Sequence, residues 1–233
     1  MVVMLAGLGL SLWASGKVKW ALAKYSQVTA SCGLTGAEVA QRILEEQGIH
    51  DVDVESVRTS SFLGMGGDGI LMDHYDPRVK KVRLSPQIYS GTSQAAVAVA
   101  AHEVGHAIQH ARGYAPFRLR GAMAPAAAFG SNFAYFLLML GFVLHAMSMV
   151  KLGILLFAVA VVFQFITLPV EWDASNRAKR LLMQYGLVSP EERRGVAGVL
   201  NAAALTYVAA AAAALLNLLY YLFRSGLLGG GRK

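Results

Sequence analysis

The sequence predicts a mainly α-helical membrane protein with a small β-hairpin or sheet and about four transmembrane helices. Two observations lead to this fold class. Of the 233 residues, 55% are hydrophobic and only 15% are charged, a composition too apolar for an ordinary soluble domain. The segment 99–110 reads Val-Ala-Ala-His-Glu-Val-Gly-His-Ala-Ile-Gln-His, and three histidines and a glutamate in so apolar a run indicate a chemical site on a helix.

Four segments without Asp, Glu, Lys or Arg supply the predicted spans: 1–16, extending to about Trp20, then 121–150, 152–170 and 195–223. The last three each provide the roughly 20 apolar residues that a bilayer helix needs. The first is shorter. It lacks the positive start and the small-residue cleavage site of a signal peptide, so we expect a retained anchor in preference to a cleaved signal. Alanine dominates 202–214, which leaves a buried helix as the alternative to a crossing there.

The distribution of positive charge orients these spans. Of the 21 Lys and Arg residues, 17 lie on one side of the predicted spans, and the other side holds only Lys151, Arg224, Arg232 and Lys233. The positive-inside rule therefore predicts a multi-pass protein of the cell membrane with its site on the cytoplasmic side. The net charge of +7 favours membrane lipids as a partner, whereas no basic patch with interleaved aromatic residues indicates nucleic acid. Nothing in the sequence decides the oligomeric state.

These features divide the chain into consecutive parts. They are an N-terminal anchor (1–20), a cytoplasmic region (21–120) with strands and the histidine-bearing helix (93–112), a transmembrane hairpin (121–170), a helix and connector (171–194), a C-terminal transmembrane helix (195–224) and a tail (225–233).

The cytoplasmic region reads as a small α/β unit. Residues 35–38, Thr-Gly-Ala-Glu, form a capping-box pattern that opens a helix, and Gly48 can close it. Residues 52–57 alternate like a short strand, and 70–75 and 79–84 look like two strands joined through Asp-Pro-Arg. Such a pair beside the following helix could bind an extended peptide by strand addition, or it could be a plain structural hairpin.

The histidine-bearing segment has the spacing H-E-x-x-H. Residues four apart share one face of a helix, so His102 and His106 can aim two imidazoles at one metal ion. Glu103 lies beside that ion, where it can deprotonate a bound water without being a ligand. Ser93 or Thr92 can cap this helix and Gly113 can end it. The alternative is a chance match in a helix whose histidines merely pack.

Other polar residues nearby carry weaker indications. His110 extends the same face and could be a third ligand, but the residues at 109 and 112 do not fit the spacing of a three-histidine site, so we expect it to support the site or face solvent. Residues 64–69 fit G-x-G-x-x-G, yet no helix follows, which indicates a loop. Asp73, His74 and Asp76 lack ligand spacing, and a turn supported by Asp76 accounts for them.

A catalytic zinc usually has three protein ligands and one open position, and the chain offers Glu171 as the third. The charge-free third span ends at Pro169, where the membrane hairpin returns to the side that it left. The predicted topology therefore brings Glu171 to the membrane surface near the His102 helix.

Four segments then carry a resemblance: Asp-His-Tyr-Asp-Pro-Arg (73–78), Ala-Ala-His-Glu-Val-Gly-His-Ala-Ile-Gln (100–109), Gly-Tyr-Ala-Pro (113–116) and Leu-Pro-Val-Glu-Trp-Asp-Ala-Ser (168–175). With them the chain resembles the YugP-type neutral zinc metallopeptidases nearly end to end. It is more distantly similar to the heat-shock and prenyl-protein membrane proteases, zincin-like enzymes in which a glutamate on a later helix completes H-E-x-x-H. Glu171 and Ala174 match their pattern, but Ser175 stands where those proteases have an aspartate, which leaves Asp173 or Asn176 for its orienting role.

The expected function is that of a zinc endopeptidase, with one Zn²⁺ held by His102, His106 and Glu171. A zinc-activated water would hydrolyse peptide bonds of peptide or membrane-protein substrates, with Glu103 as the base. His74, Tyr75 and Arg177 are candidates for supporting the transition state, and Asp173 and Ser175 for supporting the ligands.

Two other classes of function compete with this expectation. A zinc-binding scaffold or assembly factor without turnover is the main alternative, and Glu103 argues against it because a structural zinc needs no base. A transport protein is disfavoured because the predicted spans hold only one ionisable side chain of the kind that marks a transport path, His145.

Overall fold

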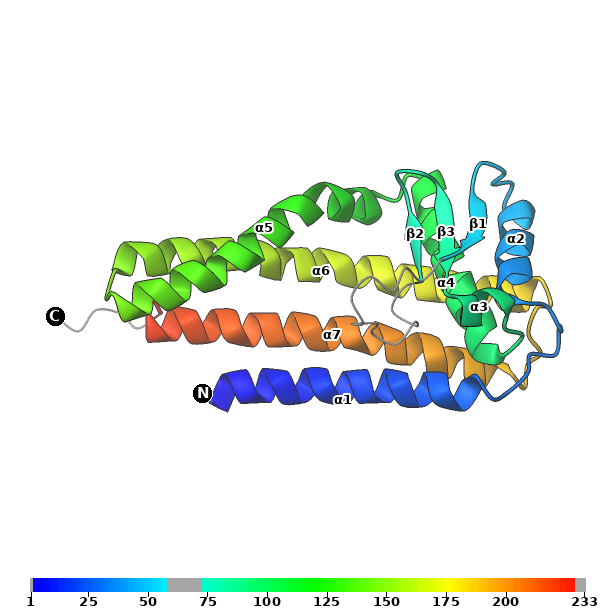
Figure 1. Cartoon of the computed structure of the whole chain (residues 1–233), viewed down its shortest axis with the longest axis horizontal. Coiled ribbons are helices and arrows are strands. Elements are labelled where there is room, and N and C mark those ends of the chain that lie inside the picture. Colours follow the sequence, from blue (N-terminus) through cyan, green and yellow to red (C-terminus); the bar gives the residue numbers. More distant parts are fainter. Residues whose placement is uncertain (1, 58–72, 229–233) are drawn as a thin grey trace. The chain divides into compact units, whose positions relative to one another are not determined.

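A computed structural model of the chain describes residues 2–57 and 73–228 (Figure 1). Ten elements follow one another: α1 (Val2–Tyr25), α2 (Gly36–Glu46), β1 (Asp53–Ser56), β2 (His74–Asp76), β3 (Lys81–Leu84), α3 (Pro86–Ser90), α4 (Gln94–Ala111), α5 (Ala115–Val143), α6 (Met147–Gln184) and α7 (Arg193–Arg224). The predicted loop at 64–69 and the start of the predicted strand at 70–72 lie outside the described residues.

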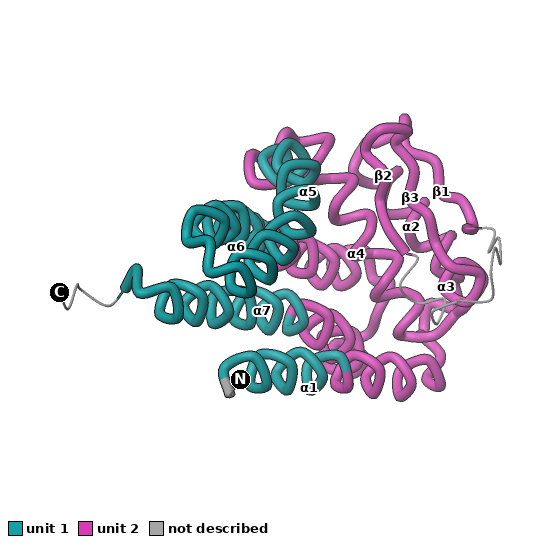
Figure 2. Tube along the Cα trace, turned by 60° about the vertical axis from the view of Figure 1, so that its left-hand side comes forward, with its two compact units in different colours: residues 1–15, 118–169, 205–233 teal, residues 16–117, 170–204 magenta. Residues whose placement is uncertain are grey.

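The chain forms two compact units (Figure 2). Unit 1 comprises residues 1–15, 118–169 and 205–233, and unit 2 comprises residues 16–117 and 170–204. The boundaries fall inside α1, α5, α6 and α7, so each of these helices contributes residues to both units. The division of the chain into an anchor, a cytoplasmic region, a hairpin and a tail stays a prediction.

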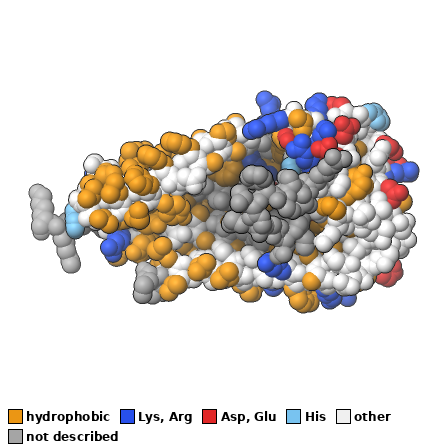
Figure 3. Space-filling view, viewed as in Figure 1, with side chains coloured by type: hydrophobic (Ala, Val, Ile, Leu, Met, Phe, Trp, Pro, Cys, Tyr) orange, Lys and Arg blue, Asp and Glu red, His pale blue; other side chains and the backbone are white. Residues whose placement is uncertain are grey.

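Unit 1 is helical and apolar. Among the described residues, three helices are long and apolar enough to cross a membrane, namely α5, α6 and α7. α1 is not among them, so a fourth crossing stays a prediction. The core of the unit holds Ala134, Leu138, Val150, Ile154, Phe157, Val161 and Tyr221. Phe129, Phe136 and Leu155 are instead at least half exposed, and Figure 3 shows many hydrophobic side chains on the visible surface of the helical part of the chain.

The helical hairpin of α5 and α6 differs from the predicted membrane hairpin at its turn and at its C-terminal end. α5 ends at Val143 and α6 begins at Met147, so the turn falls earlier than the break expected at Lys151, with His145 in the left-handed region at φ 54°. The charge-free run ends at Pro169, but α6 continues through this proline to Gln184. Glu171 therefore lies on the helix that forms the third predicted span, not on a separate one.

Unit 2 contains a three-stranded sheet in the order β1-β3-β2. β2 pairs antiparallel with β3, which confirms the predicted hairpin, whereas β1 pairs parallel with β3. The Asp76 carboxylate accepts a hydrogen bond from the Arg78 backbone N–H at 3.0 Å, so the predicted turn is supported by Asp76. β2 lies at the edge of the sheet and contacts α4.

Helices cover this sheet and complete the core of unit 2. The capping box that opens α2 is confirmed, because Thr35 accepts from the Glu38 N–H and Glu38 accepts from the Thr35 N–H. α2 packs on α3, α4 and β1. The short helix α3, which starts at Pro86 and was not predicted, separates the hairpin from α4. α4 is buried along most of its length. Its packing therefore determines the direction in which the face with His102 and His106 is turned.

Candidate metal centre

α4 presents the H-E-x-x-H residues. The Ser93 side chain accepts a hydrogen bond from the Ala96 N–H at 3.2 Å and caps the helix. At the other end Gly113 adopts φ 63°, a left-handed conformation that favours glycine. The helix therefore extends over nearly the range predicted from sequence, and His102 and His106 lie one turn apart on it.

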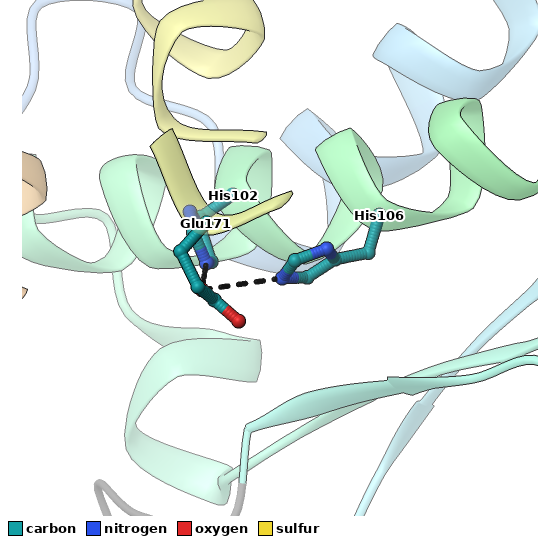
Figure 4. Close-up of side chains that lie close together, drawn as sticks. All are labelled: His102, His106 and Glu171. Atoms are coloured by element: carbon teal, nitrogen blue, oxygen red, sulfur yellow. Dashed lines mark hydrogen bonds and ion pairs between the residues drawn. The ribbon is translucent and has the colours of Figure 1, made fainter. Parts of the chain in front are cut away.

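Two imidazoles and a carboxylate converge between α4 and α6 (Figure 4). Glu171 Oε2 lies 3.2 Å from His102 Nε2 and 3.6 Å from His106 Nε2. The potential ligand atoms of the three residues all lie within 4.8 Å of one another. All three belong to unit 2, and the Glu171 side chain is only 2% exposed. Among the described residues they are the one group of three or more His, Cys, Asp and Glu side chains arranged in this way.

A glycine permits this convergence. A Cβ atom at Gly105 would lie 2.8 Å from the Ala174 carbonyl oxygen, which is closer than real Cβ contacts, and 3.1 Å from the Ala174 Cα. Gly105 therefore lets the backbones of α4 and α6 touch three residues from the point where Glu171 reaches the histidines. Gly105 is the second x of H-E-x-x-H, and its lack of a side chain allows the short distance between α4 and α6.

Replacing Gly105 by alanine should push α4 and α6 apart, destabilise unit 2 by about 1–3 kcal/mol, as overpacking does, and weaken metal binding. The control is Gly16→Ala on α1, because a Cβ atom there meets nothing within 4 Å. Thermal unfolding and zinc affinity measured on both variants check the expectation. Equal behaviour of the two variants would show that the close approach of the helices is not needed.

Glu103 lies beside the converging side chains but is not one of the three that converge. Its Oε2 accepts a hydrogen bond from the Tyr75 backbone N–H at 3.0 Å, so strand β2 holds the carboxylate. Burial raises the pKa of Glu103 to about 7, and the charge of Glu171 acts in the same direction, while His102 opposes them. A carboxyl group with a raised pKa next to potential metal ligands is typical of an acid–base group.

A polar network contacts His106 at Nδ1, the ring nitrogen that does not face Glu171. His106 Nδ1 lies 3.0 Å from Gln109 Oε1. The Gln109 amide N–H groups donate to the Val170 carbonyl oxygen and to Asp173 Oδ2, both at 2.8 Å. Arg177 Nε donates to the same Asp173 oxygen at 2.6 Å. Asp173 thus reaches a histidine through Gln109. Gln109 was not among the residues predicted for the site, although its place three residues after His106 on one helix was a usable indication.

His102 has a different neighbour. The Ser175 hydroxyl lies 3.2 Å from His102 Nδ1. Of the two residues considered for the orienting role, Asp173 contacts Gln109, the neighbour of His106, and Asn176 is exposed.

The remaining predicted residues lie around this centre. His110 does not belong to the converging group, and its Nδ1 lies 2.8 Å from the Tyr75 hydroxyl. Burial raises the pKa of Tyr75 to about 12, so this phenol stays protonated. His74 is exposed on β2, and Arg177 is engaged with Asp173 and stacks over Tyr114. The Asp73 carboxylate accepts from Ser85 and is not part of the group.

The donor set fits a zinc ion. Two imidazole nitrogens and one carboxylate oxygen are ligands that Zn²⁺ accepts, and three of them leave the fourth position open. Both Nδ1 atoms face a polar side chain, which turns both Nε2 atoms toward Glu171. Ligating histidines are generally held in this way.

A family model described as "Putative neutral zinc metallopeptidase" matches residues 1–226. The chain belongs to this family. A curated relative, "Putative membrane protease YugP" of Bacillus subtilis (strain 168), is 49% identical over 217 residues, which cover 93% of this chain and 92% of the relative. No solved structure matches. The resemblance noted from the sequence is therefore confirmed. The family description implies zinc, and the described residues supply one group of side chains that fits it.

Proposed function

We propose that this protein is a zinc-dependent endopeptidase that hydrolyses peptide bonds of protein substrates at the cytoplasmic surface of the cell membrane. One observation carries the proposal. Two imidazoles of an H-E-x-x-H helix and a carboxylate from a second helix converge, while the glutamate of the motif is buried beside them and is bonded to the edge strand instead of to the group. The Glu171 carboxylate is thus placed to be a metal ligand, and the separate Glu103 carboxylate is placed to be a base.

The residues have distinct roles in this proposal. His102, His106 and Glu171 would hold one zinc ion. When bound, zinc supplies a Lewis acid that polarises a carbonyl group and makes water acidic enough to lose a proton near neutral pH. Glu103 takes that proton and delivers it to the leaving amine. The Tyr75 N–H, 3.0 Å from one oxygen of Glu103, keeps the carboxylate from turning away.

One edge of the sheet lies beside the metal-binding helix and suits an extended substrate. Among the described strands, β2 lies at this edge and contacts α4, the helix that bears the histidines. A peptide that adds to such an edge lies alongside the metal-binding helix with its backbone stretched out. The substrates expected from this arrangement are unfolded or loop segments of proteins, including membrane proteins.

A zinc-binding scaffold without turnover is less well supported. A structural zinc site fills its fourth position and needs no base. Here three side chains converge, and the carboxylate of Glu103 is kept out of the group by a backbone hydrogen bond. Such a buried carboxylate is costly to maintain without a role.

The proposal is tested by metal analysis and hydrolysis together. Protein purified in detergent without chelator should carry about one zinc per chain and should cleave an unstructured protein such as casein. A chelator should abolish the cleavage, and added zinc should restore it. Hydrolysis at an unchanged rate after complete removal of metal would contradict the proposal.

The side of the membrane is a separate part of the proposal and rests on the positive-inside rule. In a Cys32→Ser background, Ser148→Cys and Val79→Cys each provide one exposed site, at the start of α6 and next to β3. An impermeant maleimide should label Ser148→Cys in intact cells and Val79→Cys only after the inner face is opened. The reverse labelling pattern would place the site outside the cytoplasm.

A further inference from the structure

Gln109 is among the most completely buried polar side chains in the described part of the chain, with 0% of its surface exposed. It lies in the last turn of α4, and its amide contacts only residues of α4 and α6. A buried amide is costly unless its donors and acceptor are satisfied. Both ends of this amide are satisfied, and one of them faces a proposed zinc ligand.

The partners of Gln109 fix which way its amide points. The Val170 carbonyl and the Asp173 carboxylate can only accept hydrogen bonds, and they lie on the same side of the amide, each 2.8 Å from Nε2. The nitrogen must therefore face them, and Oε1 must face His106. Since a carbonyl oxygen can only accept, His106 carries its proton on Nδ1. Its Nε2 then has a free lone pair, which is directed toward Glu171.

Asp173 and Arg177 strengthen this arrangement. Arg177 Nε donates to Asp173 Oδ2 at 2.6 Å, so the carboxylate stays charged and in place. That charge polarises the Gln109 amide and makes its oxygen a better acceptor. His102 has no comparable support, because the Ser175 hydroxyl near its Nδ1 can donate or accept.

We propose that Gln109 is a positioning residue of the metal centre, which transmits the effect of Asp173 to His106 and holds His106 in its metal-binding tautomer. The inference rests on the proposed zinc site. It assigns to an amide the task that a carboxylate performs directly in many zinc enzymes. Gln109 does not touch the substrate or the reacting atoms.

The test measures zinc affinity by chelator competition in the full-length protein in detergent. Gln109→Leu removes the acceptor for His106, and its zinc affinity should fall about 10- to 100-fold, as is typical for the partner of a ligating histidine. The matched control is Gln94→Leu. Gln94 is also a buried glutamine of α4, but it contacts Glu192, far from the histidines in sequence. Its loss should leave zinc affinity within about twofold of wild type, since it changes no partner of a ligand.

A second variant separates positioning from general damage. Asp173→Asn keeps an acceptor oxygen for Gln109 and Arg177 at the same size and removes only the negative charge. Its zinc affinity should fall less than that of Gln109→Leu, since the Gln109 amide keeps its orientation toward His106 and loses only the polarising charge. The inference is wrong if Gln109→Leu binds zinc like wild type, if Gln94→Leu loses as much affinity, or if Asp173→Asn loses more affinity than Gln109→Leu. Wild-type protein without zinc would instead overturn the proposed function.

Discussion

Replacing Glu171 by alanine should remove most of the bound zinc and abolish peptide hydrolysis. The Glu171 carboxylate is 2% exposed, and one oxygen lies within 3.6 Å of both Nε2 atoms. Its loss leaves two imidazoles on one helix, which bind a metal far more weakly than three ligands. The expected decrease in zinc affinity exceeds the ~10- to 100-fold that is typical for the partners of ligands. Metal analysis after gel filtration and the casein assay measure the two effects.

Two neighbouring residues serve as controls for this substitution. His110→Ala removes a histidine whose Nδ1 contacts the Tyr75 hydroxyl, outside the converging group. Asp173→Ala removes a carboxylate that reaches His106 only through Gln109. Both variants should keep most of their zinc. Full zinc occupancy in Glu171→Ala together with loss of zinc in His110→Ala would mean that three histidines of α4 form the site.

The parts of the centre that depend on local sequence were predictable. The four-residue spacing of His102 and His106 and the cap at Ser93 follow from helix geometry alone, and the structure has α4 where they indicate it. The convergence of Glu171 with them required one further step, the return of a membrane hairpin to its starting side. Hydrophobic periodicity does not predict this return, but charge-free runs that are long enough to span a bilayer do.

The parts that depend on packing between helices were not predictable. Gln109 looks like any polar residue near a helix end, and only the position of α6 makes it a link between His106 and Asp173. The end of the charge-free run at Pro169 does not reveal that α6 continues through this proline, which would usually end a helix in water. Apolar surroundings tolerate it more readily. The parallel pairing of β1 with β3 depends on strand order, which alternation does not reveal.

Replacing Glu103 by glutamine should stop hydrolysis and leave the metal in place. Glutamine has the same shape, and its side-chain oxygen can still accept the hydrogen bond that Tyr75 donates. An amide cannot take up the proton that the reaction releases. The loss of a positioned acid–base group typically costs about 10²- to 10⁴-fold in rate. Because Glu103 is not in the converging group, zinc content should equal that of wild type.

The most direct measurement is the rate of casein cleavage by wild-type protein and by Glu103→Gln, both purified in the same way and both shown to contain the same amount of zinc. We predict about one zinc per chain in each, cleavage by the wild type, and cleavage at least ~100-fold slower in the variant. Cleavage at the wild-type rate by zinc-loaded Glu103→Gln would contradict the account, because Glu103 would then not be the base.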